Sequence, residues 1–337
     1  MDLRFGAVFG LVEGELQVVS EHSLLCVLPR GGTLAKRAKY RLDHGKGTHH
    51  VDAFDTLIAD PSVVISHRIL KTFQQPGYRP PFLPTVALKM LSLIREPEVT
   101  MQEIIAVLEE DPVLVANVLR IAQSPIYKTA MPVKSLQGAI LRLGLKTVQE
   151  VVLQASMGMR VFRAKGYQSL LRELHAHSVA TAHIAKIICY QTTMSGEYAF
   201  LCGILHDLGT VGALLALGDV PKGKKVPNLE GIWPSIDEIH EESSGILAKL
   251  WGLPAEIEMV ISHHHTVVID GYPHPLAATI CLAEHLAHEF GVGVSAPIDS
   301  TPVDVLEMCA RELGITDSLW KIIRRDIRHK LEQISFR

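Results

Sequence analysis

The sequence predicts a mainly α-helical protein, an all-helical bundle preceded by a small α/β region at the N-terminus. Three observations lead to this fold class. A strand-like alternation of apolar residues is confined to residues 5–28. From residue 78 onward, apolar residues recur at helical spacing and helix-capping patterns accompany them. Between these regions the proline- and glycine-rich segment 74–84 predicts a linker, so we expect a domain boundary near residue 78.

Composition is that of an ordinary soluble globular protein of about two to three domains. The chain has 337 residues, 47% hydrophobic and 20% charged, with a formal net charge of -3. This balance gives no global signal for DNA or for an anionic membrane, and no long uncharged apolar segment predicts a membrane span. The five cysteines are scattered without a Cys-x-x-Cys pair, so we expect a protein of the reducing cytoplasm.

The N-terminal region, residues 1–77, carries the strand-like pattern. Apolar residues alternate on both sides of a predicted turn at Glu13 and Gly14, which indicates a small hairpin or sheet. Residues 30–46 are basic and contain glycines, but they lack a strand-glycine-helix motif, so a solvated loop is favoured over a nucleotide-binding loop. The histidines at 44, 49 and 50 are interpreted as exposed loop residues rather than as a weak metal site. The sequence assigns no role to this region.

The helical region, residues 78–290, contains recognisable helix ends. Residues 100–103 (Thr-Met-Gln-Glu) form a capping box, and residues 111–112 (Asp-Pro) form an N-cap followed by proline. Gly144 is placed to end a helix. Residues 147–150 (Thr-Val-Gln-Glu) and 235–238 (Ser-Ile-Asp-Glu) predict two further helix starts, the second opening a helix that ends near Trp251.

A C-terminal extension, residues 291–337, carries two more predicted helices. The last one combines an apolar stripe with a basic remainder that includes Arg324, Arg325 and Arg328. Packing onto the domain with solvated arginines is favoured over docking of a partner or an anionic surface.

Histidines and carboxylates recur on otherwise apolar helical stretches in the second half of the chain. Burial of such groups costs free energy unless they are paired or bound to a metal. A shared metal site explains the whole series. Its members are His177, His206, Asp207, His240, His263, His264, His265 and Glu284.

Several ordered sequence pieces resemble the HDOD domain, an HD-related output domain of bacterial signalling proteins. They are LP at 83–84, EDPVL at 110–114, LRIAQSPIY at 119–127 and AILRLG at 139–144. The resemblance covers about residues 78–290 and departs slightly at Gln123, where the family usually has asparagine. It implies an all-helical HD-superfamily-like bundle.

The same resemblance assigns the candidate ligands. His177 matches the first histidine of HD-superfamily domains, and His206 with Asp207 matches the pair that names the superfamily. Glu284 stands where the superfamily places an aspartate. The family pattern also implies ligation by His240 and by a pair within the triple histidine, and Ser244 replaces a usual glycine.

A second way to align the three histidines comes from HD-GYP domains, which are HD-superfamily members that hydrolyse cyclic-di-GMP. Residues 271–273 (Gly-Tyr-Pro) match the GYP tripeptide when counted from His263 and His264, whereas counting from Trp251 selects His264 and His265. All three histidines therefore stay candidates. Thr210 stands where those domains usually carry lysine. The tripeptide is interpreted as a turn before a helix that starts near Pro275.

Imidazole nitrogens mixed with carboxylate oxygens suit manganese, iron or zinc, as one ion or two. The resemblance implies a bacterial signal-transduction protein whose domain acts as a regulatory or binding module toward a signalling partner or a nucleotide; an oligomer is compatible with the sequence. The alternative is a metal-dependent phosphohydrolase acting on a cyclic dinucleotide or another phosphoester, in which the metal activates water. A third hypothesis is a purely structural metal with a closed coordination shell.

Overall fold

The protein is described by a computed structural model that divides into two compact units, Met1–His50 and Val51–Arg337. The described residues are 8–12, 15–20, 61–75, 78, 85–94, 96, 98–124, 127, 133, 135–157, 166–196, 198–220, 223, 225–295 and 301–334. The predicted basic loop after residue 30, the histidines at 44, 49 and 50 and the LP pair at 83–84 lie outside the described residues.

The first unit contains the predicted hairpin. Strand β1 (Val8–Val12) pairs antiparallel with β2 (Glu15–Ser20), and Val12 lies opposite Glu15. The register shifts between Val8 and Phe9, which is a β-bulge or a similar irregularity. The alternating pattern in the sequence therefore predicted both strands.

The second unit contains two helical lobes, and in the one here called the first lobe the apolar stripes of five helices meet in one core. Its core residues include Met90, Ile104, Leu114, Val118 and Ile140. The helices that contribute them are α3 (Thr85–Ile94), α4 (Met101–Glu109), α5 (Pro112–Ala122), α6 (Leu136–Leu143) and α7 (Leu145–Ser156).

Most predicted helix ends of the first lobe are confirmed. Thr100 and Glu103 form the reciprocal capping box of α4, and the Asp111 side chain accepts from the Val113 amide at the start of α5. Gly144 ends α6 with a φ of 79°. The start predicted at Thr147 is wrong, because the chain re-enters a helix directly after Gly144 and Thr147 lies inside α7.

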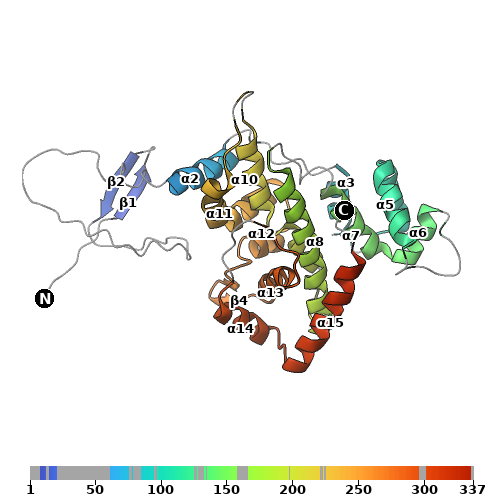
Figure 1. Ribbon diagram of the computed structural model, residues 1–337. Helices are drawn as coiled ribbons and strands as arrows, with labels where there is room; N and C mark the ends of the chain where they lie inside the picture. The colour runs from blue at the N-terminus through green and yellow to red at the C-terminus, as the bar shows by residue number, and fades with distance from the viewer. Residues whose placement is uncertain are drawn as a thin grey trace, which may run out of the picture. The chain divides into compact units, whose positions relative to one another are not determined.

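The remaining helices form the second lobe, which holds the larger core. Within it α8 packs against α9 and α13, and α10 packs against α11 (Figure 1). Its helices are α2 (Pro61–Gln74), α8 (Gln168–Gln191), α9 (Ala199–Leu205), α10 (Leu208–Gly218), α11 (Leu229–Leu250), α12 (Ala255–Ile261), α13 (Pro275–Glu289), α14 (Val303–Glu312) and α15 (Asp317–Gln333).

Helix α2 packs on α10 and α11, although it precedes the predicted boundary near residue 78. Its Ile69 and Phe73 are 1% and 2% exposed, and the Ser66 hydroxyl donates to the Ser235 carbonyl at 3.2 Å. The division of the chain by contacts accordingly lies at residues 50 and 51.

Helix α11 starts earlier than its sequence pattern predicts. It begins at Leu229 after Asn228 and continues through Pro234, so the predicted start at Ser235 is wrong. Ile232 and Trp233 are buried in the core and favour the helical path before the proline. The tertiary packing overrides the local capping signal.

The turn predicted at residues 271–273 lies one residue earlier, at Asp270 and Gly271, because Tyr272 and Pro273 belong to a small hairpin that the sequence did not indicate. Strand β3 (Val268–Ile269) pairs with β4 (Tyr272–Pro273), joined by Asp270 and Gly271. Both turn residues have positive φ, 52° and 86°, as a tight two-residue turn requires. Helix α13 then begins at Pro275.

The stretch Ala199–Gly218 is the one described segment long and apolar enough to cross a membrane, and 83% of its most apolar window is buried inside the fold. It is divided at His206 and Asp207 into α9 and α10. These properties are those of a core element.

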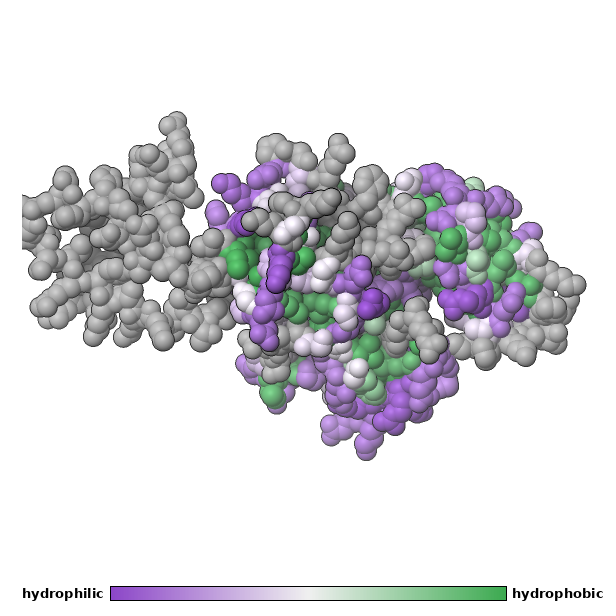
Figure 2. All heavy atoms as spheres, turned by 45° about the horizontal axis from the view of Figure 1, so that its top comes forward, coloured by the Kyte–Doolittle hydropathy of each residue, from purple (hydrophilic) through white to green (hydrophobic). Residues whose placement is uncertain are grey.

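The C-terminal helix packs as predicted. Ile323 and Ile327 of α15 are fully buried, while Arg324, Arg325 and Arg328 are exposed. Hydrophilic side chains gather over the C-terminal helices at the lower edge of the molecule in Figure 2. The basic face of α15 is thus largely a solvated face.

Candidate metal centre

The long helix α8 positions the first histidine of the site. His177 is 1% exposed, and its Nδ1 donates to the Val292 carbonyl at 2.9 Å. A carbonyl can only accept, so the ring proton lies on Nδ1 and the lone pair of Nε2 is free. His175, two residues earlier on the same helix, instead contacts the Gln154 carbonyl at 3.3 Å, since residues two apart in a helix point in different directions.

His206 and Asp207 occupy the corner where α9 ends and α10 begins. His206 is fully buried, and its Nδ1 donates to the Gly203 carbonyl at 2.9 Å. Its Nε2 lies 3.4 Å from Asp207 Oδ2. The change of direction between the two helices presents both side chains on the inner side of the corner.

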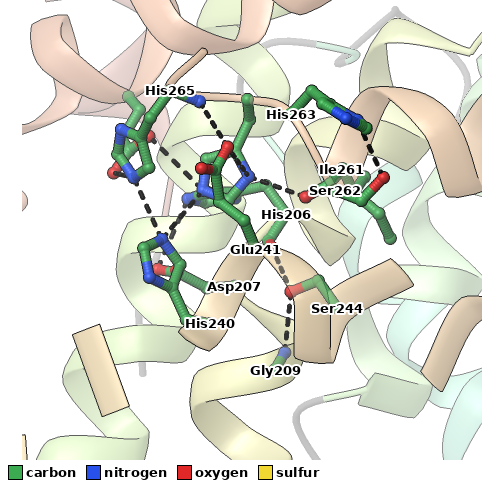
Figure 3. A network of polar contacts seen from close by, with 12 residues as sticks. His206, Asp207, Gly209, His240, Glu241, Ser244, Ile261, Ser262, His263 and His265 are labelled. Carbon is green, nitrogen blue, oxygen red and sulfur yellow. Dashed lines mark hydrogen bonds and ion pairs between the residues drawn. The ribbon is translucent and has the colours of Figure 1, made fainter. Parts of the chain in front are cut away.

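Gly209 and Ser244 hold this corner against α11 (Figure 3). A Cβ atom on Gly209 would lie 2.2 Å from the His240 carbonyl oxygen, so only glycine permits this approach. The Ser244 hydroxyl donates to the His206 carbonyl at 2.6 Å and accepts from the Gly209 amide at 2.8 Å. Gly209 itself lies inside α10, and its role is close packing rather than bending of the chain. The serine at 244 adds two hydrogen bonds to this close packing.

His240 of α11 and His264 form the second part of the site. His264 is fully buried and donates from Nδ1 to the Ile261 carbonyl at 2.7 Å, and His240 donates from Nδ1 to the Asp237 carbonyl. Their Nε2 atoms lie 3.3 Å apart. His265 Nε2 lies 3.0 Å from His240 Nε2.

His263 lies outside this group. Its Nδ1 contacts the Met259 carbonyl at 2.9 Å and the Ser262 hydroxyl at 3.0 Å. Figure 3 shows His263 apart from the cluster of His206, His240 and His265. The geometry therefore brings together His264 and His265, the pair given by the count from Trp251.

Helix α13 contributes Glu284 and, one turn later, His288. The Glu284 carboxylate lies 4.0 Å from His264 Nε2 and 3.7 Å from His265 Nε2. The ring of His288 lies against that of His177, with centroids 4.5 Å apart and the two planes tilted by 43°. His288 extends the site beyond the predicted residues.

The ligand atoms gather into three groups, each with its members within 4.8 Å of one another. They are His240 with His264 and His265, His177 with His206 and Asp207, and His177 with Glu284 and His288. His177 belongs to two groups, and the rings of His206 and His264 lie 5.2 Å apart. The groups therefore form one contiguous centre.

Burial controls the charges in this centre. It lowers the pKa of His177 and of His265 to about 3, with nearby imidazoles adding to the effect, so both rings are neutral at neutral pH. Burial would raise the pKa of Asp207, but His206 and other imidazoles outweigh it and lower the pKa to about 2. Burial, followed by repulsion from Asp207, raises the pKa of Glu284 well above its usual range. A bound cation would offset this cost of ionising Glu284.

Several buried polar atoms of the centre have no hydrogen-bond partner among the described residues. They are His177 Nε2, His206 Nε2, His288 Nε2 and Glu284 Oε2. Unsatisfied buried groups are rare in folded proteins, because each costs about 1–3 kcal/mol. Lone pairs that converge in one place can coordinate a divalent ion, so these unpartnered atoms fit a metal site.

The comparison with known families agrees with this geometry. The family model described as HDOD domain matches residues 81–267, which is more than half of the chain. The chain belongs to the HDOD family.

The structural neighbours of this HDOD protein share its fold. An HDOD domain protein of unknown function from Geobacter sulfurreducens has a TM-score of 0.58 at 23% identity, covering 80% of this chain and 97% of that one. A candidate metal-dependent phosphohydrolase from Shewanella amazonensis SB2B also gives 0.58, at 16% identity and with coverage of 80% and 99%. At these low identities, the TM-scores show a common fold and no more.

A curated relative, an uncharacterised protein of Treponema pallidum, is 25% identical over 220 residues. The match covers 60% of this HDOD chain and 41% of the relative, so this chain spans less than half of the relative's length.

Two residues near the HDOD centre were absent from the sequence prediction. His288 lies four residues after Glu284 on one helix, a spacing that places both on the same face and could have indicated it. Glu241, next to His240, accepts from the His265 amide at 2.8 Å. Its position behind the histidines depends on the fold of the turn after α12, which no sequence pattern specifies.

Proposed function

We propose that this chain is a bacterial signalling protein whose HDOD domain binds one or two divalent transition-metal ions and acts as a regulatory or binding module. The ligands are His177, His206, Asp207, His240, His264, His265 and Glu284, joined by His288, which is new to the set. Nitrogen and oxygen donors together favour iron, manganese or zinc. The extra His263 is left outside the ligand set.

One observation carries this proposal. The Nε2 atoms of His240 and His264 face each other at 3.3 Å while both Nδ1 atoms donate to backbone carbonyls. Two lone pairs then point at each other with no hydrogen between them. Two imidazoles that ligate one zinc ion have nitrogens about 2.9–3.4 Å apart, for Zn–N bonds of about 2.0–2.1 Å. A shared ion turns this repulsion into two bonds.

Two features favour a module over an enzyme. The ligands lie deep: His177 is 1% exposed, His206 and His264 are fully buried, and the side chain of His265 is 28% exposed. Thr210 stands where HD-GYP domains usually carry a lysine, and a neutral threonine offers no cation to a phosphate. Its hydroxyl is buried, with the residue 3% exposed, and donates to Asp207 Oδ1 at 3.5 Å. The binding partner we propose is a signalling protein or a nucleotide, in the cytoplasm.

A metal-dependent phosphohydrolase is the second candidate, and the completeness of the ligand set favours it. Bound metal would supply Lewis acidity and a deprotonated water. In such an enzyme the backbone-oriented imidazoles and Asp207 would hold the ions, and the partly exposed His265 would be accessible to a phosphoester.

Elemental analysis tests the metal site. The purified full chain, the His264→Ala variant and the matched His263→Ala variant are each reconstituted with iron, manganese or zinc. We expect about one or two equivalents in the wild type and in His263→Ala, and a loss in His264→Ala. Equal metal content in all three proteins would refute the proposed centre.

Hydrolysis assays then separate the two candidates. The metal-loaded protein and its Asp207→Asn variant are incubated with cyclic-di-GMP and with bis(p-nitrophenyl) phosphate. A regulatory module leaves both substrates intact. Turnover by the wild type that is lost in Asp207→Asn would establish the phosphohydrolase instead.

A further inference from the structure

A cavity of about 570 Å³ lies away from the metal centre, where α5 and α7 of the first lobe meet α8 and α15 of the second lobe. Its size falls within the range of about 300–1,000 Å³ typical of small-molecule sites. None of the proposed metal ligands lines it. It is therefore a separate feature of the fold.

Cations outnumber acids on the wall of this cavity. Arg120, Lys186 and Lys330 contribute three positive charges, against Glu150 and Asp326. Lys186 neutralises Glu150, because its Nζ lies 2.6 Å from both carboxylate oxygens.

Asp326 is also engaged on this wall. It accepts from Gln191 at 2.7 Å and from Arg325 at 2.8 Å. Both acids of the wall are thus occupied by other side chains, and the surplus charge of the cavity is positive.

Lys330 and Ser124 are the groups that lack partners. No described carboxylate lies within ion-pair distance of Lys330, and burial together with Lys186 lowers the pKa of its ammonium group. The Ser124 hydroxyl is buried without a hydrogen-bond partner among the described residues. A cation and a hydroxyl donor on the wall of one cavity suit an anionic ligand that can accept several hydrogen bonds.

The rest of the wall is apolar or aromatic. Ile121, Val151 and Ile187 line it together with the rings of Tyr127 and Tyr190. Tyr190 is 82% exposed, so its ring lies at the open side. Such a surface suits a planar ring attached to the anionic group.

We propose that this cavity binds a small organic phosphate that carries a planar ring, of the size of a nucleoside monophosphate. Lys330 and Arg120 face the phosphate, the Ser124 hydroxyl donates to it, and the tyrosines contact the ring. The cavity shares α8 with the metal centre, since Lys186 and His177 belong to that helix. The bound phosphate compound thus contacts α8, the helix that also carries the proposed metal ligand His177.

Calorimetric titration of the full chain with AMP and with GMP tests this site, with inorganic phosphate as the reference ligand. We expect Lys330→Gln to weaken nucleotide binding about tenfold or more, as loss of a charge-assisted contact does. Ser124→Ala is expected to weaken it to a smaller extent. The matched control Lys321→Gln, an exposed position on the same helix, leaves the affinity unchanged.

Two further comparisons make the result decisive. His206→Ala retains nucleotide binding if the site is the cavity, and loses it if the nucleotide occupies the metal centre, which would overturn the proposal. Circular dichroism spectra verify that each variant is folded. The proposal is also overturned if neither nucleotide binds at millimolar concentration, if Lys330→Gln binds like the wild type, or if phosphate alone binds as tightly as AMP and GMP.

Discussion

His240 and His264 face each other through Nε2 atoms 3.3 Å apart, although α11 carries one ring and the turn after α12 carries the other. Each ring is fixed in orientation by a backbone carbonyl of its own segment. The ligand geometry is therefore built into the fold before any ion binds, which is the arrangement expected of a preorganised metal site.

The Ser244 hydroxyl links α11 to the corner at His206. Ser244→Ala removes its hydrogen bonds to the His206 carbonyl and the Gly209 amide, and we expect the free energy of unfolding to fall by about 1–3 kcal/mol. Urea denaturation measures the change. Ser243→Ala is the matched control, because the Ser243 hydroxyl is buried without a partner among the described residues. A loss of stability in the control equal to that in Ser244→Ala would contradict the linking role.

Gly209 permits the close approach of α10 to α11. The Cβ atom of Gly209→Ala would lie 2.2 Å from the His240 carbonyl and 2.6 Å from the Ser244 amide, both backbone atoms that cannot rotate away. We expect a destabilisation of about 1–3 kcal/mol and a lower metal content. Gly231→Ala, with no atom within 4 Å of the new Cβ, is expected to stabilise α11 by about 0.5–1 kcal/mol. Thermal unfolding of both variants tests the pair.

His288 distinguishes one bound ion from two. If the group of His177, Glu284 and His288 holds an ion of its own, His288→Ala lowers the metal content by about one equivalent and leaves the remaining ion bound. His285→Ala on the same helix is the control, since His285 belongs to none of the groups. Elemental analysis of both variants gives the count. An unchanged content in His288→Ala would mean that His288 is a packing residue.

The buried imidazoles make the stability of the metal-free protein depend on pH. The pKa of His177 is about 3 in the folded chain, whereas an unfolded histidine titrates near pH 6.5. The unfolded state therefore binds more protons between these values. We expect the free energy of unfolding to decrease on acidification from pH 6.5 toward 3, by up to about 1.4 kcal/mol per pH unit for this residue.

Urea denaturation in the presence of a chelator, at several pH values, measures this slope. His177→Gln is expected to show a shallower dependence on pH than the wild type. His329→Gln, which replaces an exposed histidine on α15, should leave the slope unchanged. A slope in His177→Gln identical to that of the wild type would exclude His177 as a source of the effect.

Local sequence patterns were sufficient for much of the fold. The capping box at Thr100, the N-cap at Asp111 and the glycine stop at Gly144 depend on neighbouring residues alone, and all are confirmed. The starts predicted at Thr147 and Ser235 were wrong. Helix α7 begins directly after Gly144, and burial of Ile232 and Trp233 extends α11 toward the N-terminus. A local capping signal therefore predicts a helix end correctly only where tertiary packing does not favour another one.

The sequence by itself determined the helical class, the membership suggested by the ordered HDOD pieces, and the residue types available to a metal. The tertiary structure decided which of them meet. It turned His263 toward the Met259 carbonyl, grouped His264 and His265 with His240, and added His288 to the set. The physical reason is that local carbonyls fix the direction of most rings, such as that of Ile261 for His264, whereas the packing of distant helices decides which rings meet. His177 is the exception, because its acceptor, the Val292 carbonyl, lies far away in sequence.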